Sequence, residues 1–298
     1  MNLGYACINT QLKEEGIFTN RTCRKKTFEE KGLAYIDQLA LQNVKDLLRI
    51  IEWNEANGIK LFRISSQVFP WMEFYEWDAL PSIGEIRDLM LRGGEKASQF
   101  SQRLTMHPGP YHCLASPSPK VVERTIRGLE KHSEQFDMMG YDPSPYNKIN
   151  IHVGGAYGNK EETLERFSEN FRLLSPSLQK RLVLENDDSP NEFSLKDLHE
   201  DVWKKISIPL TFDYFHHKFN TGGLTEEEAL KLAASTWPEG VRQCCHYSES
   251  RRKEKLDETV RPQAHSDTIY EEIQTYGLEP DVVIEAKLKE QAIKMYVH

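Results

Sequence analysis

Several features that define specialised classes of protein are missing from this sequence of 298 residues. No run of 18 or more apolar residues occurs, so the sequence predicts no membrane-spanning helix. The N-terminus lacks the basic and then apolar layout of a secretory signal. The five cysteines are odd in number and form no Cys-x-x-Cys pair, which argues against a disulfide framework and for a reducing compartment. These absences predict a cytoplasmic protein without a membrane partner.

An excess of positive charge is also missing. The 46 acidic residues outnumber the 38 basic ones and give a net charge of −8. This balance weighs against a nucleic-acid partner, but binding depends on the local potential and not on the charge of the whole surface. Bound divalent cations would offset part of the negative charge near a site. The composition therefore lowers the expectation of a DNA partner without excluding one.

Short apolar runs recur along the chain and alternate with longer segments of helical periodicity. Such runs are typical of parallel strands buried on both faces. Between the first two runs, Val44, Leu47, Leu48 and Ile51 follow the spacing of one helix face, and Gly58 is a stop signal. The strands are predicted at residues 3–9, 60–64, 103–107, 149–152, 181–185, 208–213, 241–246 and 282–285.

Eight strands that alternate with helices predict an α/β fold, a closed (β/α)₈ TIM barrel. Further helices are expected over residues 119–139 and 160–174, and Thr225 is expected to cap another. An open doubly wound sheet is the alternative. Because the chain contains no short-period repeat and no low-complexity segment, we expect a single domain over residues 1–298.

Polar side chains follow six of the predicted strands, at the point where each apolar run ends. In a βα barrel these ends meet at the C-terminal mouth, where catalytic groups converge. Histidine and carboxylate ligands together suit Zn²⁺, Mn²⁺ or Fe²⁺. Paired ions about 3.5–4 Å apart can activate a water and stabilise the leaving oxygen of a phosphoryl displacement. The residues are His107, His152, Glu185, Asp213 with His216 three positions later, His246 and Glu285.

Each of these residues alone also has a purely structural interpretation. A single histidine at a strand end is more often hydrogen-bonded than metal-bound, and a buried glutamate can pair with an arginine. Six such strand ends are hard to explain in this way, because many unpaired acids at an apolar barrel mouth are energetically costly. The pattern therefore predicts a cluster of divalent metal ions.

Several motifs in order along the chain resemble those of the ultraviolet-damage endonucleases. They include His-Pro-Gly at 107–109 and Asp-Tyr-Phe-His-His at 213–217, and the match runs from Leu3 to about Gln291. The other matching segments are 3–9, 62–66, 152–158, 184–187, 261–265 and 284–287.

This resemblance implies a βα barrel related to endonuclease IV that binds two or three divalent ions, usually Mn²⁺, with Zn²⁺, Co²⁺ or Mg²⁺ as alternatives. It implies nicking of double-stranded DNA immediately 5′ to ultraviolet photoproducts, leaving a 3′-hydroxyl, and so a nucleoid-associated protein, which we expect to be a monomer. It further implies that Tyr5, Asn9 and Tyr111 touch the DNA near the lesion. The implied metal ligands are His107, His152, Glu185, Asp213, His216, His246, His265 and Glu285.

The chain departs from the family pattern at three positions. Glu73 stands near the place of a family histidine, where it is either an oxygen ligand or a surface residue. Pro110 replaces a glutamine and, having no donor, can act only as an apolar wedge. Cys244 replaces a lysine that can be carboxylated to bind metal; it is either a thiolate ligand or a mistranscribed lysine.

Basic residues also fall on two loops that should face the barrel mouth. Arg21 lies in the loop after the first strand, and Arg251 and Arg252 lie after the seventh. Such clusters can grip phosphates, although a solvated charge run is the common alternative. We expect Glu185 and Glu285 to bridge or clamp the ions during hydrolysis.

Lys287, which follows Glu285 in the same motif, is expected to steady the phosphate. The nearest alternative activity is that of an abasic-site endonuclease, followed by a sugar isomerase on the same metal barrel. A lesion-binding protein without catalysis is the third.

Overall fold

The computed structural model describes residues 1–297, and its centre is one sheet of eight parallel strands. Neighbouring strands pair in the order β6-β5-β4-β3-β2-β1-β8-β7. A parallel bridge between Asp213 and His246 joins the two ends of this order and brings the barrel close to closure. The strands are β1 (Asn2–Ala6), β2 (Leu61–Ile64), β3 (Arg103–Met106), β4 (Ile149–Ile151), β5 (Leu182–Glu185), β6 (Leu210–Thr211), β7 (Cys244–Tyr247) and β8 (Asp281–Ile284).

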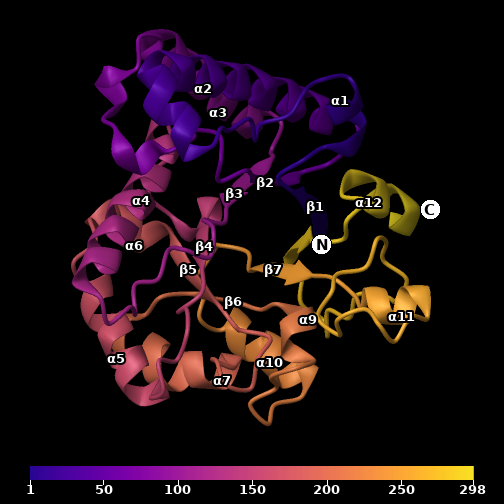
Figure 1. Cartoon of the computed structure of the whole chain (residues 1–298). Coiled ribbons are helices and arrows are strands. Elements are labelled where there is room, and N and C mark those ends of the chain that lie inside the picture. Colours follow the sequence, from indigo (N-terminus) through magenta and orange to yellow (C-terminus); the bar gives the residue numbers. More distant parts are fainter. Residues whose placement is uncertain (298) are drawn as a thin grey trace.

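Helices surround the strands and cover the outside of the barrel (Figure 1). The longer ones are α2 (Lys25–Ala56), α3 (Ile83–Gln99), α4 (Pro119–Met138), α5 (Lys160–Phe171) and α10 (Glu226–Ala234). The short ones are α1 (Thr10–Glu14), α6 (Pro176–Arg181), α7 (Leu195–Leu198), α8 (Lys204–Ile206), α9 (Tyr214–His217), α11 (Arg251–Lys255) and α12 (Glu290–Val297). Single turns are formed by η1 (Met72–Phe74), η2 (Trp77–Ala79), η3 (Pro145–Asn147) and η4 (His199–Trp203).

The strands are almost completely buried, which explains why they read as continuous apolar runs. Their outward side chains join one large hydrophobic cluster with the helices, and a smaller cluster forms around Leu61, Val183 and Val283. At the start of β3 and β8, Arg103 and Asp281 form a buried ion pair of 3.0 Å. The core therefore holds all eight strand ends in fixed positions.

The sequence predictions for the elements are confirmed, with shifts of a few residues at the ends. All eight predicted strands are present, as are the helices expected after residues 119 and 160. Thr225 caps α10 in a reciprocal capping box with Glu228, and Gly58 has the positive φ of a helix stop. Within residues 1–297, no helix combines the length and apolarity needed to cross a membrane.

Candidate metal centre

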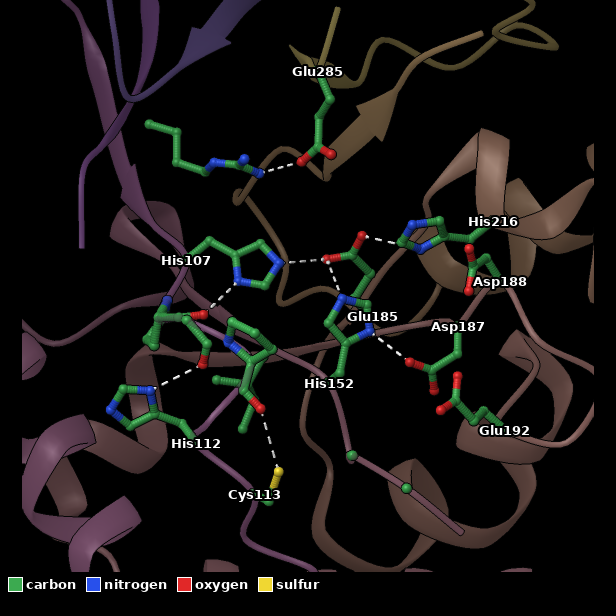
Figure 2. Close-up of a pocket in the computed structure, with 17 residues that line it drawn as sticks. His107, His112, Cys113, His152, Glu185, Asp187, Asp188, Glu192, His216 and Glu285 are labelled. Carbon is green, nitrogen blue, oxygen red and sulfur yellow. Dashed lines mark hydrogen bonds and ion pairs between the residues drawn. The ribbon is translucent and has the colours of Figure 1, made fainter. Parts of the chain in front are cut away.

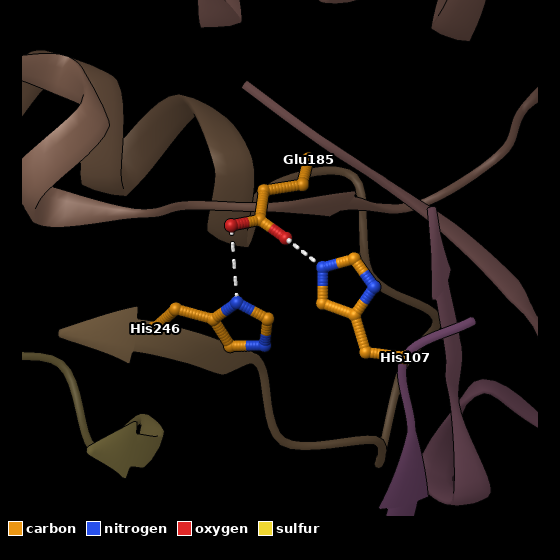
Figure 3. A group of neighbouring side chains, drawn as sticks. All are labelled: His107, Glu185 and His246. Carbon is orange, nitrogen blue, oxygen red and sulfur yellow. Dashed lines mark hydrogen bonds and ion pairs between the residues drawn. The ribbon is translucent and has the colours of Figure 1, made fainter. Parts of the chain in front are cut away.

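Glu185, the last residue of β5, lies at the centre of the barrel mouth and is 1% exposed. Its two carboxylate oxygens face histidines from four other segments, so that side chains far apart in the sequence converge on one group. His246 on β7 and His107 after β3 direct ring nitrogens at opposite oxygens of this carboxylate (Figure 3). His152 after β4 and His216 on α9 also direct ring nitrogens at the Glu185 carboxylate (Figure 2).

The distances in this cluster are those expected between ligands of a shared ion. His246 Nδ1 lies 3.0 Å from Glu185 Oε1, and His107 Nε2 lies 3.2 Å from Oε2. His152 Nε2 and His216 Nδ1 each lie 3.5 Å from a Glu185 oxygen. Two ligands with bonds of about 2.1 Å at near-right or tetrahedral angles are separated by about 3.0–3.4 Å.

Two sets of three side chains could each hold an ion, and Glu185 belongs to both. The first set is His107, Glu185 and His246; the second is His152, Glu185 and His216. Because one carboxylate is shared, it could bridge two neighbouring ions through its two oxygens. The donor atoms present therefore fit a pair of divalent metals.

Glu285, which follows β8, forms a further part of the same mouth. His246 Nδ1 lies 3.5 Å and His265 Nδ1 lies 3.7 Å from the two Glu285 oxygens. The guanidinium of Arg63 on β2 donates to Glu285 Oε1. Burial alone would raise the pKa of Glu285, but the charge of Arg63 holds it below the ordinary value. Glu285 is therefore ionised and faces the other predicted ligands.

Asp213 is fully buried beside the cluster and has one unused oxygen. Its Oδ1 accepts a hydrogen bond from the backbone N–H of His216, while Oδ2 lies 4.0 Å from His216 Nδ1 and has no hydrogen-bond partner among the described residues. Burial raises the pKa of Asp213 to about 7, with a further contribution from the negative charge of Glu185. A buried carboxylate oxygen without a partner is costly unless an ion or water satisfies it. This atom thus supports a cation near His216.

The four histidines around Glu185 fall into two electrostatic classes. Burial lowers the pKa of His107, and it lowers the pKa of His246 to about 3, so both present neutral rings at pH 7. Burial has the same tendency at the other two, but nearby carboxylates reverse it. Glu185 and Asp187 raise the pKa of His152 to about 10. Asp213 and Glu185 raise the pKa of His216 to about 9.

A buried polar network lies beneath Glu185 and holds it in place. Asn150 on β4 donates its amide N–H to Glu185 Oε2. Lys148 Nζ lies 3.1 Å from Asn150 Oδ1 and 3.1 Å from His246 Nε2. Lys148, Asn150, Glu185 and His246 therefore form a closed ring of hydrogen bonds, which fixes the direction of the carboxylate and the imidazole.

The cluster lies in a cavity of about 570 Å³ that opens at the barrel mouth. Five carboxylates line this cavity: Glu185, Asp187, Asp188, Glu192 and Glu285. Without bound cations, such a cavity would repel any anionic substrate, since the charges lie close together in a poorly solvated space. Divalent ions would change the sign of the potential at this point and make the cavity suitable for a phosphate.

The predicted DNA-contacting residues divide into a buried and an exposed group. Tyr5 and Asn9 are both 0% exposed. The Tyr5 hydroxyl accepts from Asn9 Nδ2 at 2.9 Å and donates to Asn54 Oδ1 at 2.8 Å. Tyr5 is thus packed inside the core with its hydroxyl satisfied, and contacts of Tyr5 and Asn9 with DNA stay predictions. In contrast, Tyr111 is 79% exposed and adjoins the exposed Pro110 at the rim of the cavity, which suits a contact with a ligand.

The predicted basic phosphate contacts are engaged within the chain. Arg21 pairs with Asp46 at 2.7 Å, Arg252 with Glu258 at 3.0 Å, and Arg251 with Asp267 at 3.7 Å. Lys287 is exposed and does not line the cavity. Contacts of these side chains with phosphate stay predictions, and any such contact would have to compete with the ion pairs.

The two unusual ligand predictions lie outside the cluster. Within residues 1–297, neither candidate metal set includes Glu73 or Cys244. Glu73 Oε1 faces His112 Nε2 at 3.7 Å in a neighbouring cavity. Cys244 is fully buried in the small apolar cluster, and its backbone carbonyl accepts from Lys148 Nζ.

Sequence reasoning missed several residues that shape the site. Lys148 and Asn150 precede His152 at intervals of two, which places all three on one face of the extended segment that contains β4. That periodicity was the signal that could have found them. Asp187 lies 2.8 Å from His152 Nδ1, and Arg63 was noted only as part of a motif.

A single-domain TIM barrel, with histidine and glutamate side chains at its mouth that could hold metal ions, defines the class of this protein. Within that class, residues 1–297 match the model of the family described as UV-endonuclease UvdE. The chain belongs to this family.

Individual relatives agree with this assignment. The UV-damage endonuclease of Schizosaccharomyces pombe is 38% identical over 98% of this chain, but this chain spans only 49% of that protein. The UV DNA damage endonuclease of Clostridium perfringens is 34% identical over 99% of this chain and 69% of its own length. The crystal structure of SacUVDE matches with a TM-score of 0.85 and 32% identity, covering 100% of this chain and 98% of that one.

More distant structures share only the architecture. A D-psicose 3-epimerase from Clostridium cellulolyticum covers 96% of this chain, with a TM-score of 0.54 and 14% identity. At this level of identity the likeness shows the barrel fold alone.

Proposed function

We propose that this chain is a metal-dependent endonuclease that nicks double-stranded DNA immediately 5′ to ultraviolet photoproducts and leaves a 3′-hydroxyl. Family membership supports an endonuclease acting on ultraviolet damage. The single structural observation that carries the metal-dependent chemistry is the sharing of Glu185 between two sets of histidine ligands. Mn²⁺ is the proposed metal, because mixed nitrogen and oxygen donors accept it readily.

The proposed reaction is the hydrolysis of one phosphodiester bond. A water oxygen forms a bond to phosphorus, the bond from phosphorus to the 3′-oxygen breaks, and that oxygen takes up a proton to become the 3′-hydroxyl. The phosphate remains as the 5′-phosphate of the fragment that carries the lesion. Bound divalent ions would supply activation of the water and stabilisation of the leaving oxygen.

Each group of residues has a distinct part in this reaction. Glu185, held by Asn150 and His246, fixes the spacing between the two ligand sets. His107, His152, His216 and His246 complete these sets, with His265, Asp213 and Glu285 beside them. The exposed Tyr111 and Pro110 lie where an extruded base or a gap in the duplex could be contacted.

The proposal is tested with synthetic duplexes that carry one defined lesion. Equal amounts of a pyrimidine-dimer duplex, an abasic duplex and an undamaged duplex are incubated with the protein in Mn²⁺, and the ends are mapped on sequencing gels. We expect a nick directly 5′ to the dimer with a 3′ end that a polymerase extends. Faster cleavage of the abasic duplex would instead support an activity of the endonuclease IV type.

A further inference from the structure

Two buried arginines in the barrel differ sharply in how their donors are used. Arg103, at the start of β3, donates from all three nitrogens, to the carbonyls of Tyr146, Arg242 and Pro145 and to Asp281. Arg63, at the mouth, makes one side-chain hydrogen bond among the described residues, from one terminal nitrogen to Glu285. Its Nε is buried without an acceptor. A guanidinium has five N–H donors, so most of those on Arg63 have no partner.

The unused N–H donors of Arg63 are unusual because of where the side chain lies. Its side chain is 13% exposed and lines the cavity that contains Glu185 and the histidines. Among the described residues lining that cavity, it is the one lysine or arginine, opposed by five carboxylates. Burial alone would lower the pKa of Arg63, but Glu285 and other negative groups raise it above the ordinary value. The positive charge is therefore fixed.

Glu285 alone does not account for this arrangement. A carboxylate partner can accept two parallel N–H bonds from a guanidinium, yet Glu285 accepts only one through Oε1, while Oε2 faces His265. Buried donors without acceptors are costly and are usually explained by a missing ligand. The ligand that fits a planar cation with several free N–H groups inside a nuclease site is a phosphate oxygen.

We infer that Arg63 is a further catalytic residue of the nicking reaction, whose free N–H groups donate to a non-bridging oxygen of the scissile phosphate. This inference rests on the proposed function. The Glu285 contact holds the guanidinium beside the ligand cluster, and the Arg63 side chain lines the cavity. As charge builds on the phosphate during hydrolysis, these donors stabilise it more strongly than they stabilise the bound substrate.

The test compares Arg63→Gln and Arg63→Lys with the unaltered protein on a dimer-containing duplex. Loss of one preorganised donor to a developing oxyanion reduces kcat by about 100-fold. We expect that loss for Arg63→Gln, with a smaller change in KM, and partial recovery for Arg63→Lys. Metal content, measured by elemental analysis, is expected to stay the same in both variants. A loss of activity that merely follows loss of metal would overturn the inference.

A modified substrate identifies the atom that Arg63 contacts. Replacing one non-bridging oxygen of the scissile phosphate with methyl, in each diastereomer separately, removes the proposed acceptor in one of the two. On that diastereomer, the rate of the unaltered protein should fall by about the same factor as the rate of Arg63→Gln falls on normal DNA. Arg63→Gln has already lost the contact, so its own rate should be little lower on that diastereomer than on normal DNA. Equal penalties in both proteins for both diastereomers would contradict the contact.

Binding supplies a readout that does not depend on turnover. With Ca²⁺ in place of Mn²⁺, over times in which no product forms, the affinity for the dimer duplex is measured at several salt concentrations. One lost phosphate contact lowers the slope of log K against log salt by about 0.9. We expect this for Arg63→Gln but not for Arg63→Lys, and an unchanged slope in Arg63→Gln would also overturn the inference.

A matched control comes from Arg103, which is buried but far from the mouth. Arg103→Lys should lower Tm through its lost hydrogen bonds and leave kcat and the salt slope unchanged. If the unaltered protein itself fails to nick the dimer duplex, the proposed function fails. If it nicks and Arg63→Gln nicks equally fast, only the role of Arg63 fails.

Discussion

His246 Nδ1 lies 3.0 Å from Glu185 Oε1, and both side chains are completely buried at the mouth of the barrel. The two residues come from β7 and β5, which are not neighbours in the sheet. Their contact therefore depends on curvature of the sheet into a barrel, completed by the bridge between Asp213 and His246. Closure of the barrel is therefore what brings these two side chains together.

Glu185→Gln should abolish nicking and leave the fold intact. The amide keeps the shape of the side chain but removes the charge and one acceptor that both ligand sets share. We expect kcat to fall by more than about 100-fold, the upper end for residues that only support a ligand. Nicking of the dimer duplex and the far-ultraviolet circular dichroism spectrum are measured together.

The matched control is Glu200→Gln, since Glu200 is an exposed residue that pairs with Lys204 away from the cavity. It should cut at the normal rate. If Glu185→Gln cuts at the normal rate, the Glu185 carboxylate is not required for nicking and the prediction is wrong.

Binding of metal to chelator-stripped protein should release protons at pH 7. His152 and His216 have raised pKa values of about 10 and about 9, so both rings are protonated at this pH. An imidazole must be neutral to bind a metal, so uptake by both rings releases roughly two protons. The affinity should consequently rise with pH from 7 towards 9.

The measurement is titration calorimetry in buffers with different ionisation enthalpies, which yields the number of protons released. A binding enthalpy that does not depend on the buffer would mean that the two histidines are not ligands or are already neutral.

Tyr111→Ala should weaken discrimination between damaged and undamaged duplex. The ring is 79% exposed and lines the neighbouring cavity together with Pro110, and stacking of a base on an aromatic ring contributes about 1–3 kcal/mol. We expect the affinity for a dimer duplex to fall about tenfold or more, while affinity for undamaged duplex changes little. Tyr111→Phe keeps the ring and should behave normally. Fluorescence anisotropy measures the affinity for each duplex. An unchanged ratio of the affinity for the dimer duplex to that for the undamaged duplex in Tyr111→Ala would exclude a role of the ring in recognising the lesion.

Gly94→Ala should destabilise the fold without affecting the chemistry of the site. A Cβ at this position of α3 would lie 1.9 Å from the backbone oxygen of Met139, just beyond α4. Overpacking of this kind costs about 1–3 kcal/mol. Gly84 lies in the same helix with nothing within 4 Å of a Cβ, so Gly84→Ala should be neutral or stabilising by up to about 1 kcal/mol. Urea unfolding of both variants gives the difference between their free energies of unfolding. Equal values would contradict the close contact between Gly94 and the Met139 backbone.

The sequence predicted the parts of the site that depend on strand ends. His107, His152, Glu185, His246 and Glu285 each follow an apolar run, and a barrel brings such positions together whatever the details of packing. The sequence could not show how the ligands divide into two sets around Glu185, because that division depends on side-chain directions across the barrel.

Other features depend on contacts between residues far apart in the chain. Arg21, which was predicted to contact phosphate, pairs with Asp46, and this ion pair joins a loop to the middle of α2. The burial of Tyr5 between Asn9 and Asn54 is likewise set by the packing of α2 against β1. Charge and motif alone do not distinguish these arrangements from exposed binding residues.

The most direct test of a shared metal centre is anomalous scattering from crystals of fully active protein, combined with elemental analysis of the same sample. We predict at least two ions per chain, each within bonding distance of Glu185, one beside His107 and His246 and the other beside His152 and His216. Active protein with no metal in this cavity would contradict the account.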